Sequence, residues 1–344
     1  MKAWLWDGLK GIDHLRLTEV PDPVAKDDEV VLKVHYAALN PADRYLAEQR
    51  YPYPVNPPLP HVLGRDGMGT VIQVGKDVKD VSVGDRRAIL RGAVGVFRWG
   101  TFAERVSVPA DNLVEIPAGW SEEESAGATL VYMAAYRALT MWGPLKPNAV
   151  VLVTGASGGV GVATVQVAAA MGYTVIALSR SEEKQRRLKE LGAALTFNPE
   201  DSRWTTDAKA ALAPRGVDLA VDNIGGKLLP EVIDTMGELG KISLVGELAG
   251  PVPNFNTGTL FSRRLRIGAM ALGYYTPEET RAAWQEVLCQ LARSGARPLV
   301  DRVFPFEQLP QAFDRLAEGP MGKVLLNVKP CIADLGVSTI FELS

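Results

Sequence analysis

The segment from Val150 to Met171 constrains the fold of this chain more than any other. Four apolar residues, Val150–Val153, are followed by a glycine-rich turn, Thr154–Gly161, and then by a run of small residues that ends near Met171. A buried strand, a tight glycine turn and a closely packed helix are the parts of a dinucleotide-binding βαβ unit. The pattern therefore predicts a doubly wound parallel sheet, with a pyrophosphate at the N-terminus of the helix.

The glycines of this turn stand at positions 155, 158 and 161, with a G-x-x-G-x-x-G spacing in place of the commoner G-x-G-x-x-G. Both spacings allow a tight turn, close approach of the backbone to a pyrophosphate, and amides that face the anion. The alternative is a glycine-rich turn that binds nothing. The residues predicted to contact the pyrophosphate are Ser157, Gly158, Gly159, Val160 and Gly161.

The end of the next strand, Thr174–Leu178, distinguishes between two nicotinamide cofactors. NAD enzymes place a carboxylate there for the ribose 2′-hydroxyl, whereas NADP enzymes place a cation there for the 2′-phosphate. In this chain Ser179 and Arg180 follow the strand, Lys184 comes one turn later, and no carboxylate occupies the tip. We therefore predict NADPH, bound by these three side chains. The alternative is that the two cations are solvated surface charges.

Two further apolar runs, Leu219–Val221 and Lys241–Val245, continue the alternation of strand, turn and helix. Ligands of such sheets bind at the carboxyl ends of the strands. We therefore expect Asn223 and Gly246, which follow these runs, to lie near the nicotinamide half of the cofactor. Both could equally be loop residues without a ligand.

The first 120 residues have a different pattern, in which short β segments alternate with turns. Val30–Tyr36 alternates between residues expected to be buried and exposed, and three more segments end at glycine, aspartate or proline turns. Ser121 and the three glutamates that follow it predict the start of a long helix that enters a second domain. We predict a mostly antiparallel β domain formed by residues 1–122 and 269–344, and a Rossmann domain formed by residues 123–268.

The bulk composition excludes several classes of partner. A formal net charge of −3 and a pI near 5.8 leave no general basic field for nucleic acid or an anionic membrane surface. No uninterrupted apolar run reaches the length of about 18 residues that a membrane span needs. Because only two cysteines occur, Cys289 and Cys331, we expect no disulfide framework and predict a cytoplasmic location.

The order of these parts resembles the medium-chain dehydrogenase/reductase superfamily, and within it the zinc-free quinone oxidoreductase group that includes zeta-crystallin. The resemblance spans Met1 to Val328, and its most specific motifs are Asn40–Tyr45 with Tyr51, Gly64–Gly69, Gly84-Asp85, Thr154–Gly161 and Gly322–Leu325. It implies a GroES-like β domain beside the Rossmann domain. It also implies a homodimer joined edge to edge through the Rossmann sheets.

The resemblance further implies that no metal takes part. Zinc-containing members carry a cysteine where Asn40 stands, and Gly-His-Glu where this chain has Gly64-Arg65-Asp66. The three histidines, His14, His35 and His61, are not spaced as ligands of a zinc site. Without a Lewis acid, reducing a quinone or enone is easier than oxidising an alcohol, because conjugation spreads the developing charge onto an oxygen that hydrogen-bond donors stabilise.

The resemblance places four polar side chains around the nicotinamide: Asn40, Asp43, Tyr45 and Tyr51. The two tyrosines are candidates for orienting the carbonyl group and donating a proton; the alternative is that they only pack within a proline-rich segment. Asn40 could hold the ribose or the substrate oxygen, and Asp43 could simply cap a helix. Two further cofactor contacts are predicted at Thr129 and Lys323.

The predicted function is reduction of a quinone or an α,β-unsaturated carbonyl compound by direct hydride transfer from NADPH, with neither a metal nor a covalent intermediate. One alternative is an NADPH-dependent enoyl thioester (acyl-CoA) reductase, with a basic channel at Arg263, Arg264 and Arg266. A different class is a crystallin-like protein that binds the nucleotide without turnover.

Overall fold

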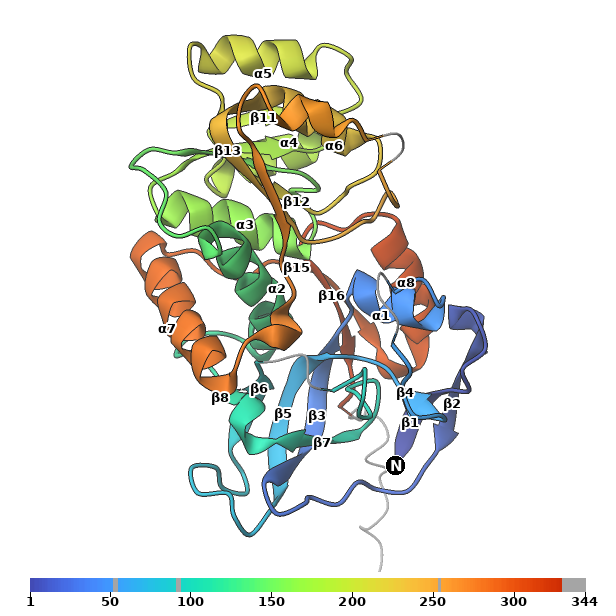
Figure 1. The fold of residues 1–344 in the computed structure, drawn as a ribbon. Helices are drawn as coiled ribbons and strands as arrows, with labels where there is room; N and C mark the ends of the chain where they lie inside the picture. The colour runs from blue at the N-terminus through green and yellow to red at the C-terminus, as the bar shows by residue number, and fades with distance from the viewer. Residues whose placement is uncertain (52–54, 91–93, 253–254, 330–344) are drawn as a thin grey trace, which may run out of the picture.

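Six strands form a parallel sheet in the upper half of the molecule in Figure 1. The computed structural model describes residues 1–51, 55–90, 94–252 and 255–329, so Cys331–Ser344 lies outside the described residues. The strands, in spatial order, are β11 (Leu195–Phe197), β10 (Thr174–Leu178), β9 (Val150–Val153), β12 (Val217–Asp222), β13 (Met236–Leu244) and β14 (Arg266–Ala269). The predicted doubly wound sheet is confirmed, with β11 and β14 as edge strands that the sequence patterns had not indicated.

Helices cover both faces of this sheet. The first face packs against α2 (Glu122–Thr140), α3 (Gly159–Ala170) and α4 (Glu182–Glu190), with α7 (Pro277–Ser294) packed on α2 and α3, and the second face packs against α5 (Trp204–Leu212) and α6 (Leu228–Thr235). All four residues of β9 are buried, because a central strand covered on both faces has no solvent side. The carboxyl ends of β9, β10, β12 and β13 therefore meet at one edge of the sheet.

A second, mostly antiparallel sheet fills the lower half of the molecule. Its main path is β15 (Val300–Pro305), β16 (Lys323–Asn327), β3 (Glu29–Ala38), β5 (Asp66–Val74), β6 (Arg86–Ile89) and β8 (Leu113–Glu115), and β7 (Arg105–Pro109) also pairs with β3. A small sheet beside it contains β2 (Leu15–Glu19), β1 (Lys2–Trp6) and β4 (His61–Val62). The remaining helices are α1 (Pro41–Ala47) and α8 (Leu309–Ala317).

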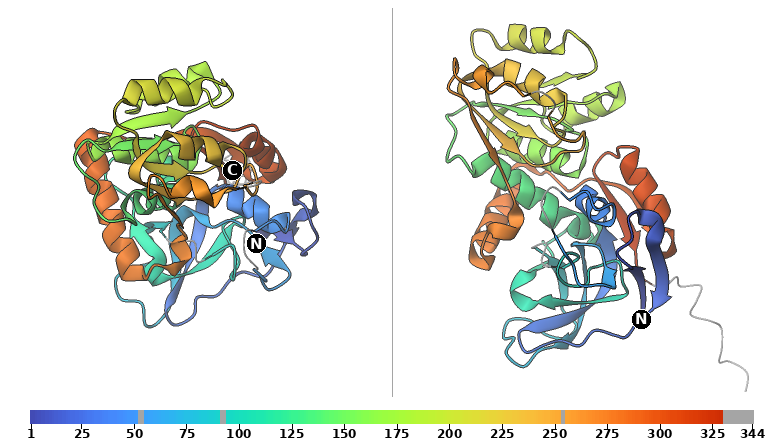
Figure 2. Two further views of the ribbon diagram at one scale, coloured as in Figure 1. Left: turned by 45° about the horizontal axis from the view of Figure 1, so that its top comes forward. Right: turned by 45° about the vertical axis from the view of Figure 1, so that its right-hand side comes forward.

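Helix α2 lies between the two sheets, as the right-hand view of Figure 2 shows. Its first turn is fixed by a capping box, in which Ser121 Oγ accepts a hydrogen bond from Glu124 N at 3.1 Å and the Glu124 carboxylate accepts one from Ser121 N at 2.7 Å. Of the C-terminal part, β15, α8 and β16 join the sheet of β3, whereas α7 packs on α2 and α3. Among the described residues, no helix is long and apolar enough to cross a membrane.

The pairing of β16 with β3 positions the site. The two strands are antiparallel, with Leu325 opposite Ala38, and Leu39 N donates a hydrogen bond to Val324 O at 3.0 Å. This register brings Lys323, at the start of β16, beside the residues that follow β3. A strand from the C-terminal part of the chain thus reaches the junction between the two sheets.

Candidate functional site

The glycine-rich turn has the shape that a bound pyrophosphate requires. Gly158 is the N-cap of α3, and Gly155 has a φ of +55°, which favours glycine. A Cβ atom added at Gly161 would lie 2.2 Å from the carbonyl oxygen of Gly155, so only glycine fits there. The turn therefore leaves the amides at the start of α3, including those of Gly159 and Val160, to face an anion.

Strand β16 touches this turn. Gly322 N donates a hydrogen bond to Ser157 O at 2.9 Å, and Gly158 and Gly322 form an isolated parallel bridge. The predicted phosphate site is thus contacted by the residue that immediately precedes Lys323. The two halves of the molecule meet at the position where the sequence predicts the cofactor.

The three side chains predicted at the 2′-phosphate differ in their burial and in their contacts with other residues. Ser179 is buried at the end of β10, whereas the Arg180 side chain is 71% exposed and its ion pair with Glu200 is 3.7 Å long. Lys184 Nζ donates a hydrogen bond to the carbonyl oxygen of Gly319, which lies between α8 and β16. Burial and the nearby Arg315 lower the pKa of Lys184. Of the two predicted cations, Arg180 is thus the less engaged by other residues, and its predicted contact with a 2′-phosphate stays a prediction.

Asn223 and Gly246 both lie at the glycine-rich turn. The Asn223 side chain donates a hydrogen bond to Thr154 O at 2.8 Å, and its backbone N–H donates one to Thr154 Oγ1 at 2.9 Å. A Cβ atom added at Gly246 would lie 3.1 Å from Asn223 O, so the loop after β13 packs closely on the loop after β12. The structure therefore brings these two predicted residues together beside the strand β9.

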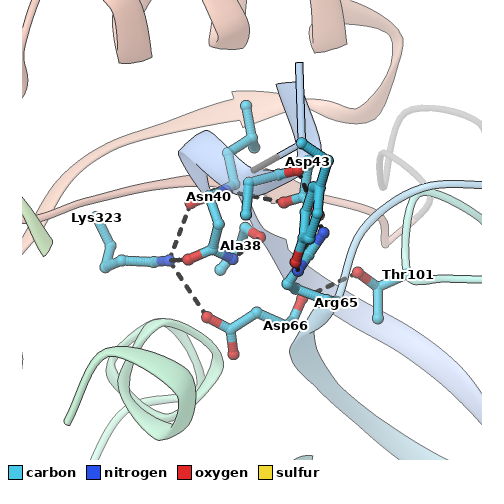
Figure 3. A network of polar contacts seen from close by, with 10 residues as sticks. Ala38, Asn40, Asp43, Arg65, Asp66, Thr101 and Lys323 are labelled. Carbon is cyan, nitrogen blue, oxygen red and sulfur yellow. Dashed lines mark hydrogen bonds and ion pairs between the residues drawn. The ribbon is translucent and has the colours of Figure 1, made fainter. Parts of the chain in front are cut away.

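A buried polar network occupies the end of β3, where Asn40 begins helix α1 (Figure 3). Lys323 Nζ donates hydrogen bonds to Asn40 Oδ1 at 2.7 Å and Leu39 O at 2.9 Å, and forms an ion pair with Asp66 Oδ2 at 3.2 Å. Lys323, Asn40 and Asp66 are all 5% exposed or less. The ammonium group is therefore held by three oxygens from two separate segments, Leu39-Asn40 after β3 and Asp66 at the start of β5.

Thr129 joins the same network from α2. Its hydroxyl lies 3.1 Å from Asp66 Oδ1 and 2.6 Å from Ile89 O. Burial raises the pKa of Asp66, while the Lys323 ammonium opposes that shift by stabilising the carboxylate. Thr129 thus orients the Asp66 carboxylate within the buried network, and its predicted contact with the cofactor stays a prediction.

Asp43 links this network to Tyr51. One carboxylate oxygen of Asp43 accepts a hydrogen bond from Asn40 N at 3.0 Å, and the other accepts one from Arg65 Nε at 3.0 Å. Arg65 also donates to Tyr51 OH at 2.9 Å and to Ala42 O at 3.2 Å. Burial opposes the charge of Arg65, but the Asp43 carboxylate and Tyr51 outweigh it, raise the pKa of Arg65 and keep it charged. Asp43 is therefore both a helix cap and a buried ion-pair partner.

Tyr45 is less constrained than Tyr51. Its hydroxyl oxygen is buried and has no hydrogen-bond partner among the described residues. Burial raises the pKa of Tyr45 above its ordinary value of 10.0, and the carboxylates of Glu48 and Glu247 add to the shift, against Arg50. Glu247 follows Gly246, so Tyr45 on α1 lies within electrostatic reach of the loop at the carboxyl end of β13. The Tyr45 O–H group is therefore available to donate a hydrogen bond.

Two members of this network were absent from the predicted site residues. Arg65 and Asp66 entered the sequence analysis only as the residues that replace the Gly-His-Glu of zinc enzymes, yet both are buried and paired here. Their signal was an adjacent pair of opposite charges inside a glycine-rich β segment. Within the described ranges, no group of three or more His, Cys, Asp or Glu residues is arranged to hold a metal ion.

Two family models match the chain. The "Alcohol dehydrogenase GroES-like domain" matches residues 26–118, and the "Zinc-binding dehydrogenase" model matches residues 159–291. The first match covers strands β3 to β8, and the second begins at helix α3. Their order agrees with the two sheets described above.

Curated relatives match over nearly the whole chain. A zinc-type alcohol dehydrogenase-like protein of Schizosaccharomyces pombe is 30% identical, over 94% of this chain and 97% of its own length. The quinone oxidoreductase of Sus scrofa is 28% identical, over 90% of this chain and 92% of its own. The acryloyl-coenzyme A reductase of Sulfurisphaera tokodaii is 28% identical, over 96% of this chain and 100% of its own.

Solved structures share the fold. An NAD-dependent alcohol dehydrogenase superimposes with a TM-score of 0.86 and 29% identity, over 96% of this chain and 100% of the other. The Escherichia coli quinone oxidoreductase complexed with NADPH superimposes with a TM-score of 0.85 and 25% identity, over 95% of this chain and 100% of the other. The likeness extends across both sheets.

Proposed function

The chain belongs to the medium-chain dehydrogenase/reductase superfamily, in its quinone oxidoreductase branch, and from that membership we propose that it reduces quinones or α,β-unsaturated carbonyl compounds without a metal. It is an NADPH-dependent oxidoreductase of that family, and NADPH supplies the hydride when bound. The glycine-rich turn fits this cofactor, since Gly161 lets the start of α3 pack directly against the backbone of Gly155 and so keeps the turn tight. We propose that the nicotinamide half of the cofactor lies beside Asn223 and Gly246, on the side of Tyr45.

The observation that carries the proposal is the buried Tyr45 hydroxyl without a partner. Burying a hydroxyl without a hydrogen bond costs about 1–3 kcal/mol, and a substrate oxygen in the pocket would remove that cost. Because the pKa of Tyr45 is raised, the phenol keeps its proton at neutral pH and can donate it to an oxygen that gains negative charge. We assign the donor role to Tyr45 because its buried hydroxyl has no partner among the described residues, whereas the Tyr51 hydroxyl is tied to Arg65.

The buried cations support a reaction without zinc. Asn40, which stands where zinc enzymes carry a cysteine, holds the Lys323 ammonium together with Asp66, and Arg65, which stands where they carry a histidine, adds a second positive charge nearby. A divalent cation would have to displace one buried cation and lie beside another, which is unfavourable at low dielectric. We therefore propose that hydrogen bonds, rather than a Lewis acid, stabilise the developing oxyanion.

Turnover with a panel of acceptors tests the function. We expect NADPH oxidation with a p-quinone, an o-quinone or an alkenal, at a rate that a chelator leaves unchanged. Tyr45→Phe should lower kcat/KM by about 100-fold while NADPH affinity stays the same. The matched control is Tyr274→Phe, since that tyrosine is 85% exposed. NADPH binding without oxidation of any acceptor would instead indicate the nucleotide-binding protein without turnover.

A thioester reductase is the second candidate, because the acryloyl-coenzyme A reductase of Sulfurisphaera tokodaii matches the whole chain. The basic cluster that the sequence offered for a coenzyme A channel is poorly placed for it. Arg266 is the first residue of β14, so it lies at the amino ends of the parallel strands, opposite their carboxyl ends. Arg263 donates hydrogen bonds to Asp234 O and Met236 O. Adding acryloyl-CoA to the acceptor panel separates the two substrate classes.

We also propose a homodimer that pairs through β14, with the cytoplasm as its location. Strand β14 is an edge of the parallel sheet, and edges that expose unpaired backbone groups favour association. Leu239 and Phe261, which lie beside it in one surface groove, are 45% and 79% exposed. Sedimentation should give a dimer for the wild-type protein and a monomer for Phe261→Asp; a wild-type monomer would contradict this assembly.

A further inference from the structure

We propose that Lys323 is a positioning residue for hydride transfer, which fixes the substrate side of the pocket to the phosphate-binding turn and does not contact the cofactor. The inference rests on the function proposed above. It replaces the cofactor contact that the sequence predicted for this lysine with a different role. The structural basis is a buried ammonium group that is surrounded by protein oxygens.

The Lys323 ammonium is already engaged by three protein oxygens, through two hydrogen bonds and one ion pair. An ammonium group has three N–H donors. Lys323 Nζ lies 2.7 Å from Asn40 Oδ1, 2.9 Å from Leu39 O and 3.2 Å from Asp66 Oδ2. A direct contact with the cofactor would therefore require the ammonium to give up one of three buried acceptors, and Figure 3 shows these acceptors converging on it.

The rest of the lysine is held at the phosphate-binding turn. A Cβ atom added at Gly159 would lie 2.9 Å from Lys323 Cδ, and one added at Gly127 would lie 3.2 Å from Lys323 Cβ and Cγ. The methylene stem thus passes between the start of α3 and helix α2, at two positions without side chains. Because Gly322 N also binds Ser157 O, one short segment touches both the turn and the substrate pocket.

The two side chains that Lys323 binds are connected to other residues of the proposed substrate site. Asn40 connects through its backbone N–H to Asp43, and Asp66 connects to Thr129. Without the ammonium, the buried Asp66 carboxylate would lose its cation and Asn40 Oδ1 its donor, so both would move. A misplacement of about 1 Å between reacting groups costs about 100-fold in rate, which makes the hydride-transfer step the sensitive readout.

The first test is Lys323→Met, which keeps the stem and removes the charge. We expect kcat at saturating NADPH to fall by about 30-fold to 100-fold, and the primary isotope effect with NADPH deuterated at C4 to rise. The dissociation constant for NADPH should change by less than about threefold. The matched control is Lys329→Met, which removes a lysine beyond the far end of β16 that pairs with Glu122.

Asp66→Asn is the second variant, chosen because it keeps the shape of the carboxylate. It should lower kcat in the same direction but less, and the double variant should be no slower than Lys323→Met alone, because both changes break one interaction. If Lys323→Met does not fold, the kcat of Asp66→Asn alone still tests the positioning role.

Three results would overturn the positioning role. The first is unchanged kcat in both variants, and the second is a tenfold or greater loss of NADPH affinity with normal kcat, which would mean direct cofactor binding. The third is a slower variant whose isotope effect equals that of the wild type, which would mean only a loss of folded enzyme. Absence of turnover in the wild-type enzyme would overturn the proposed function itself, whereas these results appear only against an active wild type.

Discussion

The two ends of the proposed cofactor site are built in different ways. The phosphate end is mainly backbone, a glycine turn whose shape excludes a Cβ atom at Gly161. Its one charged side chain in this comparison is the exposed Arg180. The reacting end consists of side chains: the ion pairs Lys323–Asp66 and Arg65–Asp43, buried and joined through Asn40. The first end depends on local geometry, and the second depends on packing that holds charges from distant segments together.

This difference predicts that the reacting end contributes more to stability. Removing one partner of a buried ion pair costs about 3–5 kcal/mol, because the other charge stays buried without compensation. Arg65→Met should therefore lower the free energy of unfolding by about 3 kcal/mol in urea denaturation. The matched control is Arg187→Met, whose ion pair with Glu190 is more than half exposed. A loss of less than 1 kcal/mol at Arg65, or equal losses in the two variants, would remove the contrast between the two ends.

At the phosphate end, the largest effect should come from Gly161→Ala. The added Cβ atom would lie 2.2 Å from the Gly155 carbonyl oxygen, which is backbone and cannot rotate away. We expect a loss of about 1–3 kcal/mol of stability and a turn that no longer binds NADPH, measured by thermal melting and nicotinamide fluorescence. Gly158→Ala is the control, because its Cβ atom would lie 3.5 Å from the same oxygen. If both variants melt alike, the steric argument fails.

The phosphate end and the reacting end also differ in how far the sequence predicted them. The glycine turn and the end of β10 were predictable as structure because each is encoded in a run of neighbouring residues. The reacting end was predicted only in part, and only through the family resemblance: Asn40, Asp43, Tyr45, Thr129 and Lys323 were named. No local pattern indicated that the ammonium of Lys323 lies 2.7 Å from an amide 283 residues away in the sequence.

The same reasoning explains why Arg65 and Asp66 were not predicted as site residues. Adjacent charges in a β segment normally alternate between solvent and the sheet, and only the pairing of β3, β5 and β16 reveals that both are buried. The edge strands β11 and β14 went unnoticed because they are short and only partly buried, so their apolar patterns are weak.

A smaller effect should separate the two ends by cofactor preference. Arg180→Ala removes the exposed cation and leaves the buried network untouched, so it should erase a preference of at least tenfold for NADPH over NADH, or about 1.4 kcal/mol. The rate at saturating NADPH should stay the same. Nicotinamide fluorescence gives the two dissociation constants, with Arg203→Ala as the control because it is an exposed arginine elsewhere on the parallel-sheet half. Retained preference in Arg180→Ala would move the 2′-phosphate site away from this residue.

The smallest effect concerns the pH dependence of the reacting end. Burial, aided by the Glu48 and Glu247 carboxylates, raises the pKa of Tyr45 above its ordinary value of 10.0. A phenol donates a proton only below its pKa, so kcat/KM should stay flat through neutral pH and fall only above about pH 10. Glu247→Gln removes a neighbouring negative charge, which makes the phenolate easier to form, so the alkaline limb should move to lower pH by less than about one unit. The pH profiles of the wild type, Glu247→Gln and Tyr45→Phe test this. An unmoved limb in Glu247→Gln would mean that the loop after β13 does not act on Tyr45, and a limb that persists in Tyr45→Phe would assign the proton to another group.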